Sequence, residues 1–405
     1  MDVESALKYI DKQIIKDGEK YLRESVRFNI VQLQSCNGLT SCPFSKADCE
    51  FEFFKDEKGK RFISFAQLFK RGMTFLDEIV NVGKGKLEGP AKNAILCLGE
   101  FFKTKKNDEK SLNFVFKKRK SGTFKASETG ITVALAEHLL KKLAPGGSYK
   151  VDANSHDQNP CLCGCNVKPN FSSTGMGANS VWHGFIDIVF TSPYQSTPES
   201  ASDDVPAIAK ALEGEEELFE SLDESKDFEE SPKMITEVKK KVSDVVLKQA
   251  LAQTIVFSLI QRKRHPDRSN HMTPNIVISP KKFKIMLYHA ENDIFLVSDY
   301  INLFNGDSLS NNAVIVLWMV LHNRMFCTGF NNVNTDIVSS LVSNFKNLVA
   351  CKLETYSNLS ECFVPKFHPK KNPSLNDSAR GCEMDLHNSV AMIDRIKLDD
   401  EKPDA

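Results

Sequence analysis

The chain has 405 residues, of which 41% are apolar, so it can bury a core in one large domain or in two to three smaller ones. Its formal net charge of zero hides a strong division, because residues 196–232 carry thirteen Asp or Glu against two Lys. This composition excludes a wholly disordered chain, and the basic remainder is suited to a polyanionic partner.

The N-terminal residues are charged throughout, and no long apolar stretch marks a signal peptide. The longest apolar run, "AVIVLWMVL" (313–321), is too short to span a bilayer and predicts a buried helix. We therefore expect an intracellular protein, nuclear or cytoplasmic, without a membrane partner. Eleven cysteines in such a compartment predict free thiols or metal ligands.

Residues 1–125 are predicted to form a mainly helical N-terminal region with a cysteine-containing loop. The stretch "ESALKYIDKQIIKDGEKYLRESVRFNIVQL" (4–33) has apolar residues at helical spacing, and further helices are expected near 63–81 and 90–103.

Residues 126–350 are predicted to form a second domain of mixed α/β character. We expect a helix over 127–143, a strand over 181–190, a strand at "KMITEVKK" (233–240) and a helix over about 243–262. A strand at 275–279 and a hairpin in "FKIMLYHAENDIFLVS" follow. The acidic stretch 196–232 is interpreted as an insertion, and residues 366–405 as a disordered tail.

Two charged residues lie on one face of the strand near residue 237. Alternate residues of a strand share a face, so Glu237 and Lys239 point the same way as Ile235. Asp187 interrupts the apolar strand "VWHGFIDIVF" (181–190), and antiparallel pairing of the two strands would bring it beside Glu237. Two neighbouring carboxylates repel each other, and a divalent cation such as Mg²⁺ would remove that cost.

Polar residues on the two neighbouring helices extend this pattern. Glu137 shares a face with apolar residues of the helix over 127–143, and Gln249 and Gln253 share an apolar face of the helix that follows Lys239. Buried glutamines need hydrogen-bond partners.

The order of a helix Glu, a strand Asp, a strand Glu-x-Lys and a helix Gln resembles the PD-(D/E)XK nuclease superfamily, especially its lambda exonuclease and RecB-like branch. The resemblance covers about 126–300. It implies a restriction-endonuclease-like core, with a mixed central sheet flanked by helices, and Mg²⁺- or Mn²⁺-dependent hydrolysis of phosphodiester bonds, by exonuclease or endonuclease action.

The resemblance also implies a role for each matching residue. Asp187, Glu237 and the carbonyl of Val238 would be metal ligands, and Lys239 the catalytic lysine. Glu137 would be the helix acid, with Glu128 as a rival, and Gln253 fits the glutamine position better than Gln249.

Basic segments at 101–125 and 261–268 are predicted to contact nucleic acid through its backbone, with DNA preferred over RNA. The alternative is a catalytically inactive protein of the same fold that acts as a nucleic-acid-binding or scaffolding module.

The segment "HDQNPCLCGC" (156–165) is a candidate Zn²⁺ site, because thiolates and imidazole are zinc ligands. Its ligands would be Cys161, Cys163 and Cys165, with the fourth from His156 or from Cys36, Cys42 or Cys49. Free thiols in a loop are the other interpretation.

Overall fold

The computed structural model describes residues 2–56, 59–60, 62–81, 89–117, 126–155, 158–191, 232–241, 243–330 and 341–361. Residues 1–365 form one compact unit, and residues 366–405, the expected tail, lie outside the described residues. The acidic insertion 196–232 also lies outside them, apart from its last residue.

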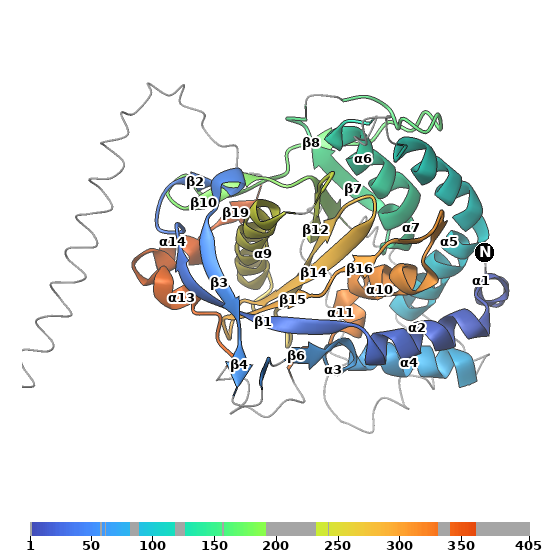
Figure 1. Cartoon of the computed structure of the whole chain (residues 1–405), viewed down its shortest axis with the longest axis horizontal. Helices are drawn as coiled ribbons and strands as arrows, with labels where there is room; N and C mark the ends of the chain where they lie inside the picture. The colour runs from blue at the N-terminus through green and yellow to red at the C-terminus, as the bar shows by residue number, and fades with distance from the viewer. Residues whose placement is uncertain are drawn as a thin grey trace, which may run out of the picture. The chain divides into compact units, whose positions relative to one another are not determined.

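Among the described residues, eleven strands form one large mixed sheet (Figure 1). Its main path runs in the order β3 (Cys49–Phe53), β1 (Arg27–Cys36), β15 (Ile294–Ser298), β14 (Lys282–His289), β13 (Met272–Ile278), β12 (Pro232–Val238), β11 (Ile188–Thr191), β7 (Ser148–Asp152) and β8 (Phe171–Ser172). Strands β6 (Phe62–Ser64) and β16 (Ile301–Asn302) pair with β1 and β14. The β12–β13 and β7–β8 pairs are parallel, and the other pairs are antiparallel.

A smaller sheet has the order β19 (Ser360–Glu361), β9 (Gly175–Gly177), β10 (Trp182–Phe185) and β2 (Cys42–Pro43). Two further short hairpins are β4 (Lys55–Asp56) with β5 (Gly59–Lys60), and β17 (Phe304–Asn305) with β18 (Ser308–Leu309).

Helices cover both faces of the large sheet (Figure 1). Helix α9 (Asp244–Arg264) packs on one face, together with α13 (Phe345–Leu348) and α14 (Leu353–Ser357). The other face carries α1 (Val3–Tyr9), α2 (Lys12–Glu24), α3 (Phe65–Leu68), α4 (Lys70–Asn81), α5 (Gly89–Val115), α6 (Glu128–Leu135), α7 (Lys141–Leu143), α10 (Asn311–Leu321) and α11 (Asn323–Phe326). A π-helical turn, Ala136–Leu140, joins α6 to α7.

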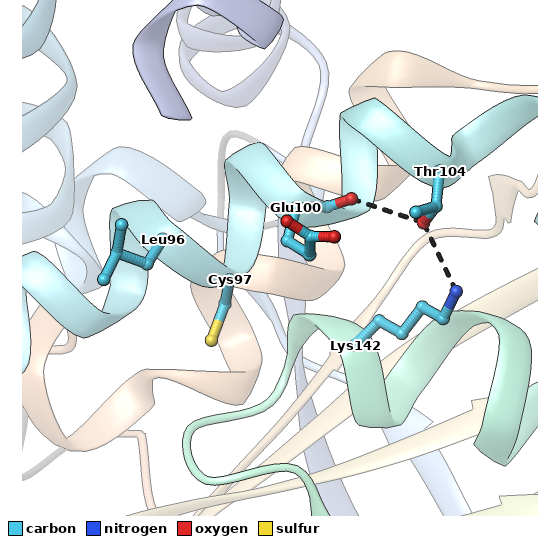
Figure 2. Close-up of a pocket in the computed structure, with 5 residues that line it drawn as sticks. All are labelled: Leu96, Cys97, Glu100, Thr104 and Lys142. Carbon is cyan, nitrogen blue, oxygen red and sulfur yellow. Dashed lines mark hydrogen bonds between the residues drawn. The ribbon is translucent and has the colours of Figure 1, made fainter. Parts of the chain in front are cut away.

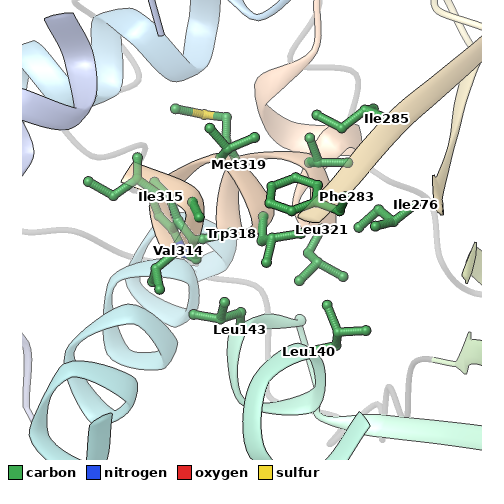
Figure 3. Close-up of a cluster of buried hydrophobic side chains, with 14 of the residues drawn as sticks. Leu140, Leu143, Ile276, Phe283, Ile285, Val314, Ile315, Trp318, Met319 and Leu321 are labelled. Carbon is green, nitrogen blue, oxygen red and sulfur yellow. The ribbon is translucent and has the colours of Figure 1, made fainter. Parts of the chain in front are cut away.

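The two cores follow from strand alternation. In β13, Val277 packs into the core under α9, whereas Ile276 and Ile278 pack into the core on the opposite face. Helix α10 is the predicted apolar run, and it is buried on all sides. Figure 3 shows Trp318 and Met319 of α10 among side chains from the sheet and from the π-helical turn.

The N-terminal region differs from its predicted form. The helix expected over 4–33 ends at Glu24, and Arg27–Cys36 forms strand β1 inside the large sheet. The β-branched Ile30 and Val31 are buried on opposite faces of that strand, so its sequence lacks the alternation that marks a half-exposed strand. Residues 1–125 therefore supply helices and part of the sheet.

The structure confirms four predicted elements: the helix over 127–143, the strand β12, helix α9 and the β14–β15 hairpin.

The strand predicted over 181–190 is divided. Residues 182–185 belong to the smaller sheet and residues 188–191 to the large one, so Asp187 lies at the crossing between the two sheets.

Over the described residues, no helix combines the length and the apolar character needed to cross a bilayer.

Candidate functional site

Four charged side chains meet at the end of strand β12. Strands β11 and β12 are antiparallel with Ile188 opposite Thr236, so the next positions, Asp187 and Glu237, are neighbours, as predicted. The Lys239 ammonium lies 2.9 Å from Oε1 of Glu237, 3.3 Å from Oδ2 of Asp187 and 2.7 Å from Oε1 of Glu128. We call Glu128, Asp187, Glu237 and Lys239 the carboxylate cluster.

The exposure of the side chains in the carboxylate cluster decreases from one end of the cluster to the other. The Glu128 side chain is 44% exposed, that of Asp187 25%, that of Lys239 17% and that of Glu237 1%. One end of the cluster is therefore open to a ligand from solution, and the other end is held inside the protein.

Electrostatics in this cluster favour additional positive charge. Burial and the neighbouring Glu237 charge raise the pKa of Asp187 well above its usual range, and burial also raises the pKa of Glu237. Burial opposes the charge on Lys239, but the three carboxylates outweigh it and raise the pKa of this side chain above its ordinary value. With all three carboxyl groups ionised around one ammonium, the cluster would carry an excess of negative charge, which a bound cation would stabilise.

Two glutamines of α9 fix the buried carboxylate. The Gln249 amide donates to Oε1 of Glu237 at 2.5 Å, and the Gln253 amide donates to Oε2 at 2.8 Å. The Oε1 atom of Gln253 is buried and has no hydrogen-bond partner among the residues that the structure describes. Both glutamines therefore contact Glu237, although the sequence pattern favoured Gln253.

The backbone orients the second carboxylate. The Val238 N–H donates to Oδ2 of Asp187 at 2.7 Å, and the Lys239 N–H donates to the Ile278 carbonyl on β13. The first bond ties Asp187 to strand β12, and the second ties the backbone of Lys239 to strand β13.

The helix acid in contact with this cluster is Glu128 rather than Glu137. The buried Glu137 carboxylate accepts a hydrogen bond from Tyr149 and lies 3.2 Å from Lys141. Nine residues separate the two acids, or about 13 Å along a helix. Of these two acids, only Glu128, at the start of the helix, contacts Lys239.

The three loop cysteines also meet, and their histidine partner is His138. Ligand atoms of His138, Cys161, Cys163 and Cys165 lie within 4.8 Å of one another, and these side chains could hold a metal ion such as zinc. His156, the fourth ligand expected from the sequence, lies outside the described residues. Cys36 and Cys49 instead face each other across β1 and β3, and Cys42 bonds within its own loop.

His138 escapes a motif search because it lies on a helix more than twenty residues before the cysteines. The signal available in the sequence is a histidine in the largely apolar stretch 131–140, and such a histidine is more often a core residue than a ligand.

A surface pocket of about 450 Å³ lies over α5 and α7. Figure 2 shows its lining, with the Lys142 ammonium 3.3 Å from the Thr104 hydroxyl; the described lining residues are Leu96, Cys97, Glu100, Thr104 and Lys142. This lining includes no residue of the carboxylate cluster, so the pocket is not the site proposed below.

The basic segments are only partly described. Residues 118–125 lie outside the described residues, whereas Lys105 on α5 pairs with Glu109 and Arg262 on α9 pairs with Glu291.

Comparison of the chain with protein-family models, with curated proteins and with solved structures gave no match.

Proposed function

We propose that this chain is a metal-dependent nuclease that hydrolyses phosphodiester bonds, with DNA as its preferred substrate, on a restriction-endonuclease-like core. The observation that carries the proposal is the contact of Lys239 with the carboxylates of both Asp187 and Glu237 at the end of β12. An aspartate, a Glu-x-Lys strand and a glutamine helix converge here from separate elements.

The oxygen donors at this position suit Mg²⁺ or Mn²⁺. These hard cations prefer carboxylate and carbonyl oxygens, and Asp187, Glu237 and the Val238 carbonyl would supply them. The Lys239 ammonium contacts both the Asp187 and the Glu237 oxygens, so the two carboxylates lie close to each other.

A divalent cation bound here would stabilise negative charge on the phosphoryl group and favour ionisation of the attacking water. The side chains of Lys239 and Glu128 would supply the other catalytic functions. Lys239, which contacts the carboxylates of both Asp187 and Glu237, would orient the water and stabilise developing negative charge. Glu128 is the carboxylate most open to solvent and is placed to receive a proton.

Basic residues of α5 and of the last turn of α9 would hold the nucleic-acid backbone. Such contacts are independent of sequence and weaken as salt rises.

The test is a cleavage assay on linear DNA, circular DNA and RNA with Mg²⁺, Mn²⁺ or EDTA. The variant is Lys239→Ala, and the matched control is Lys241→Ala, an exposed lysine two residues later. We expect metal-dependent cleavage in the wild type and in the control, with a loss of about 100-fold or more in Lys239→Ala. Binding without cleavage under every condition would instead support the inactive binding module.

A further inference from the structure

The group of one histidine and three cysteines is separate from the carboxylate cluster, and its role does not depend on the proposed nuclease function. We propose that His138, Cys161, Cys163 and Cys165 bind one Zn²⁺ ion, and that this ion anchors the cysteine loop to the helix that carries Glu128. No disulfide involves these cysteines, whose thiols are free.

The loop conformation makes a C-x-C-x-C sequence able to surround an ion. Alternate side chains of an extended strand lie about 6.6 Å apart, too far to share a tetrahedral ion. Here Gly164 has φ +90° and Asn166 has φ +58°, so the chain turns back on itself. The Cys161 N–H then donates to the Val167 carbonyl at 2.9 Å and closes the turn.

The distances between donor atoms match a tetrahedral zinc site. Bonds of about 2.3 Å to sulfur and about 2.0 Å to nitrogen place sulfurs about 3.8 Å apart and nitrogen about 3.5 Å from sulfur. The Sγ atoms of Cys161 and Cys163 are 3.4 Å apart. The Nε2 atom of His138 lies 3.0 Å from Cys163, 3.5 Å from Cys161 and 3.7 Å from Cys165.

A carboxylate on α5 selects the required form of the histidine. The Nδ1 atom of His138 lies 3.2 Å from Oδ1 of the buried Asp108, which also accepts hydrogen bonds from Lys142 and Thr104. With its proton on Nδ1, the imidazole presents the lone pair of Nε2 to the three sulfurs. Carboxylate partners of this kind orient the histidine ligands of zinc sites and raise their basicity.

The chemistry of the donors identifies the metal. Three thiolates and one imidazole form a known combination for structural zinc, whereas Mg²⁺ and Ca²⁺ require oxygen ligands. All four protein ligands are present, so the site is of the closed, structural type.

The position of the loop links the zinc site to Glu128. Leu162 packs over Gly130, where an added Cβ atom would lie 2.6 Å from the Leu162 Cδ1 atom, so a larger residue here would require this leucine side chain to move. Gly130 lies in the first turn of α6, and its N–H donates to the Ser127 side chain that caps the helix. The loop, fixed by zinc to His138 at the other end of this helix, therefore supports the turn that positions Glu128.

The test measures metal in the full chain, purified under reducing conditions. We expect about one zinc per chain by elemental analysis, and Co²⁺ exchanged into the site should show the thiolate charge-transfer and visible bands of a tetrahedral ion. The variants His138→Gln and Cys163→Ser should lose the metal. The matched controls His156→Gln and Cys97→Ser, which alter residues outside the proposed ligands, should keep it.

Two further measurements cover the case in which a ligand variant fails to fold. Asp108→Asn keeps all four ligands and should weaken zinc binding about 10- to 100-fold. Removal of zinc from the wild type by a chelator should increase amide hydrogen exchange in both 158–167 and 128–133. A wild type without zinc or a tetrahedral cobalt spectrum would overturn the site, as would loss of zinc in His156→Gln but not in His138→Gln. Unchanged exchange in 128–133 would overturn the link to Glu128.

Discussion

The ammonium group of Lys239 lies 2.7 Å from the carboxylate of Glu128, a residue 111 positions earlier in the chain. This contact joins the end of strand β12 to the first turn of helix α6. It also distinguishes the two acids of the helix, because Glu137 contacts Tyr149 and Lys141 instead.

We expect Glu128→Gln to affect mainly activity and Glu137→Gln to affect mainly stability. Glu128→Gln should lower kcat/KM for DNA cleavage about 10- to 100-fold, because it weakens the charge partner of Lys239. Its effect on stability should be below about 1 kcal/mol, since this carboxylate is 44% exposed. Glu137→Gln should cost about 1.5–3 kcal/mol of unfolding free energy, because a buried charged acceptor is lost. Steady-state kinetics and urea unfolding separate the two, and a selective loss of activity in Glu137→Gln would contradict the assignment.

The two glutamines of α9 should differ in their contribution to stability. Gln253 is fully buried, so Gln253→Leu leaves an oxygen of Glu237 without its donor, at a cost of about 1.5–3 kcal/mol. Gln249 is half-buried and water can replace its amide, so Gln249→Leu should cost less than about 1 kcal/mol. Urea unfolding of both variants measures the difference, and equal losses would argue against a dry environment around Glu237.

The buried His322 should make the protein less stable in mild acid. Burial lowers the pKa of this imidazole to about 4, against about 6.5 in the unfolded chain. Below pH 6.5 the unfolded state binds more protons, so stability is fully present above that pH and is lost as the pH falls toward 4.

The variant His322→Phe isolates this contribution. Between pH 7 and pH 5 the wild type should lose about 2 kcal/mol more unfolding free energy than the variant does. Guanidinium unfolding at the two pH values measures it, and parallel losses in both proteins would show that His322 is not buried as a neutral side chain.

Residues 192–231 should be replaceable by a short hairpin turn. Thr191 and Pro232, which flank them, are paired neighbours on β11 and β12. The carboxylate cluster lies at the opposite end of this strand pair, about 13 Å away at 3.3 Å per residue. If residues 192–231 form the linker that their composition predicts, shortening it about tenfold lowers the entropy cost of closing the loop by about 2 kcal/mol, so thermal unfolding should occur at an equal or higher temperature.

The same variant tests whether the acidic stretch competes with nucleic acid for the basic surface. Competition predicts tighter DNA binding after the replacement, measured by fluorescence anisotropy at fixed salt. Unchanged affinity supports a solvated linker.

Local patterns were sufficient to predict much of the fold. The β14–β15 hairpin and helices α9 and α10 follow from alternation, from a polar turn and from an apolar run, which depend on nearby residues only. Strand β1 was missed because it is buried on both faces by segments distant in sequence.

The proposed site was predictable where strand geometry determines it. Period-two alternation puts Glu237 and Lys239 on one face, and antiparallel pairing brings Asp187 beside them. The choice between Glu128 and Glu137 depends on how far the helix extends past the sheet, which no local pattern specifies. His138 depends on a π-helical turn and on a loop that folds back to it.

The position of Asp187 between two sheets has a thermal consequence. The sheet before it consists of short strands, and such elements open by local unfolding at a lower free energy than a large buried core. When the small sheet opens, Asp187 loses its anchor on one side while Glu237 stays buried. We therefore expect any activity that uses Asp187 to be lost on heating before the molecule as a whole unfolds.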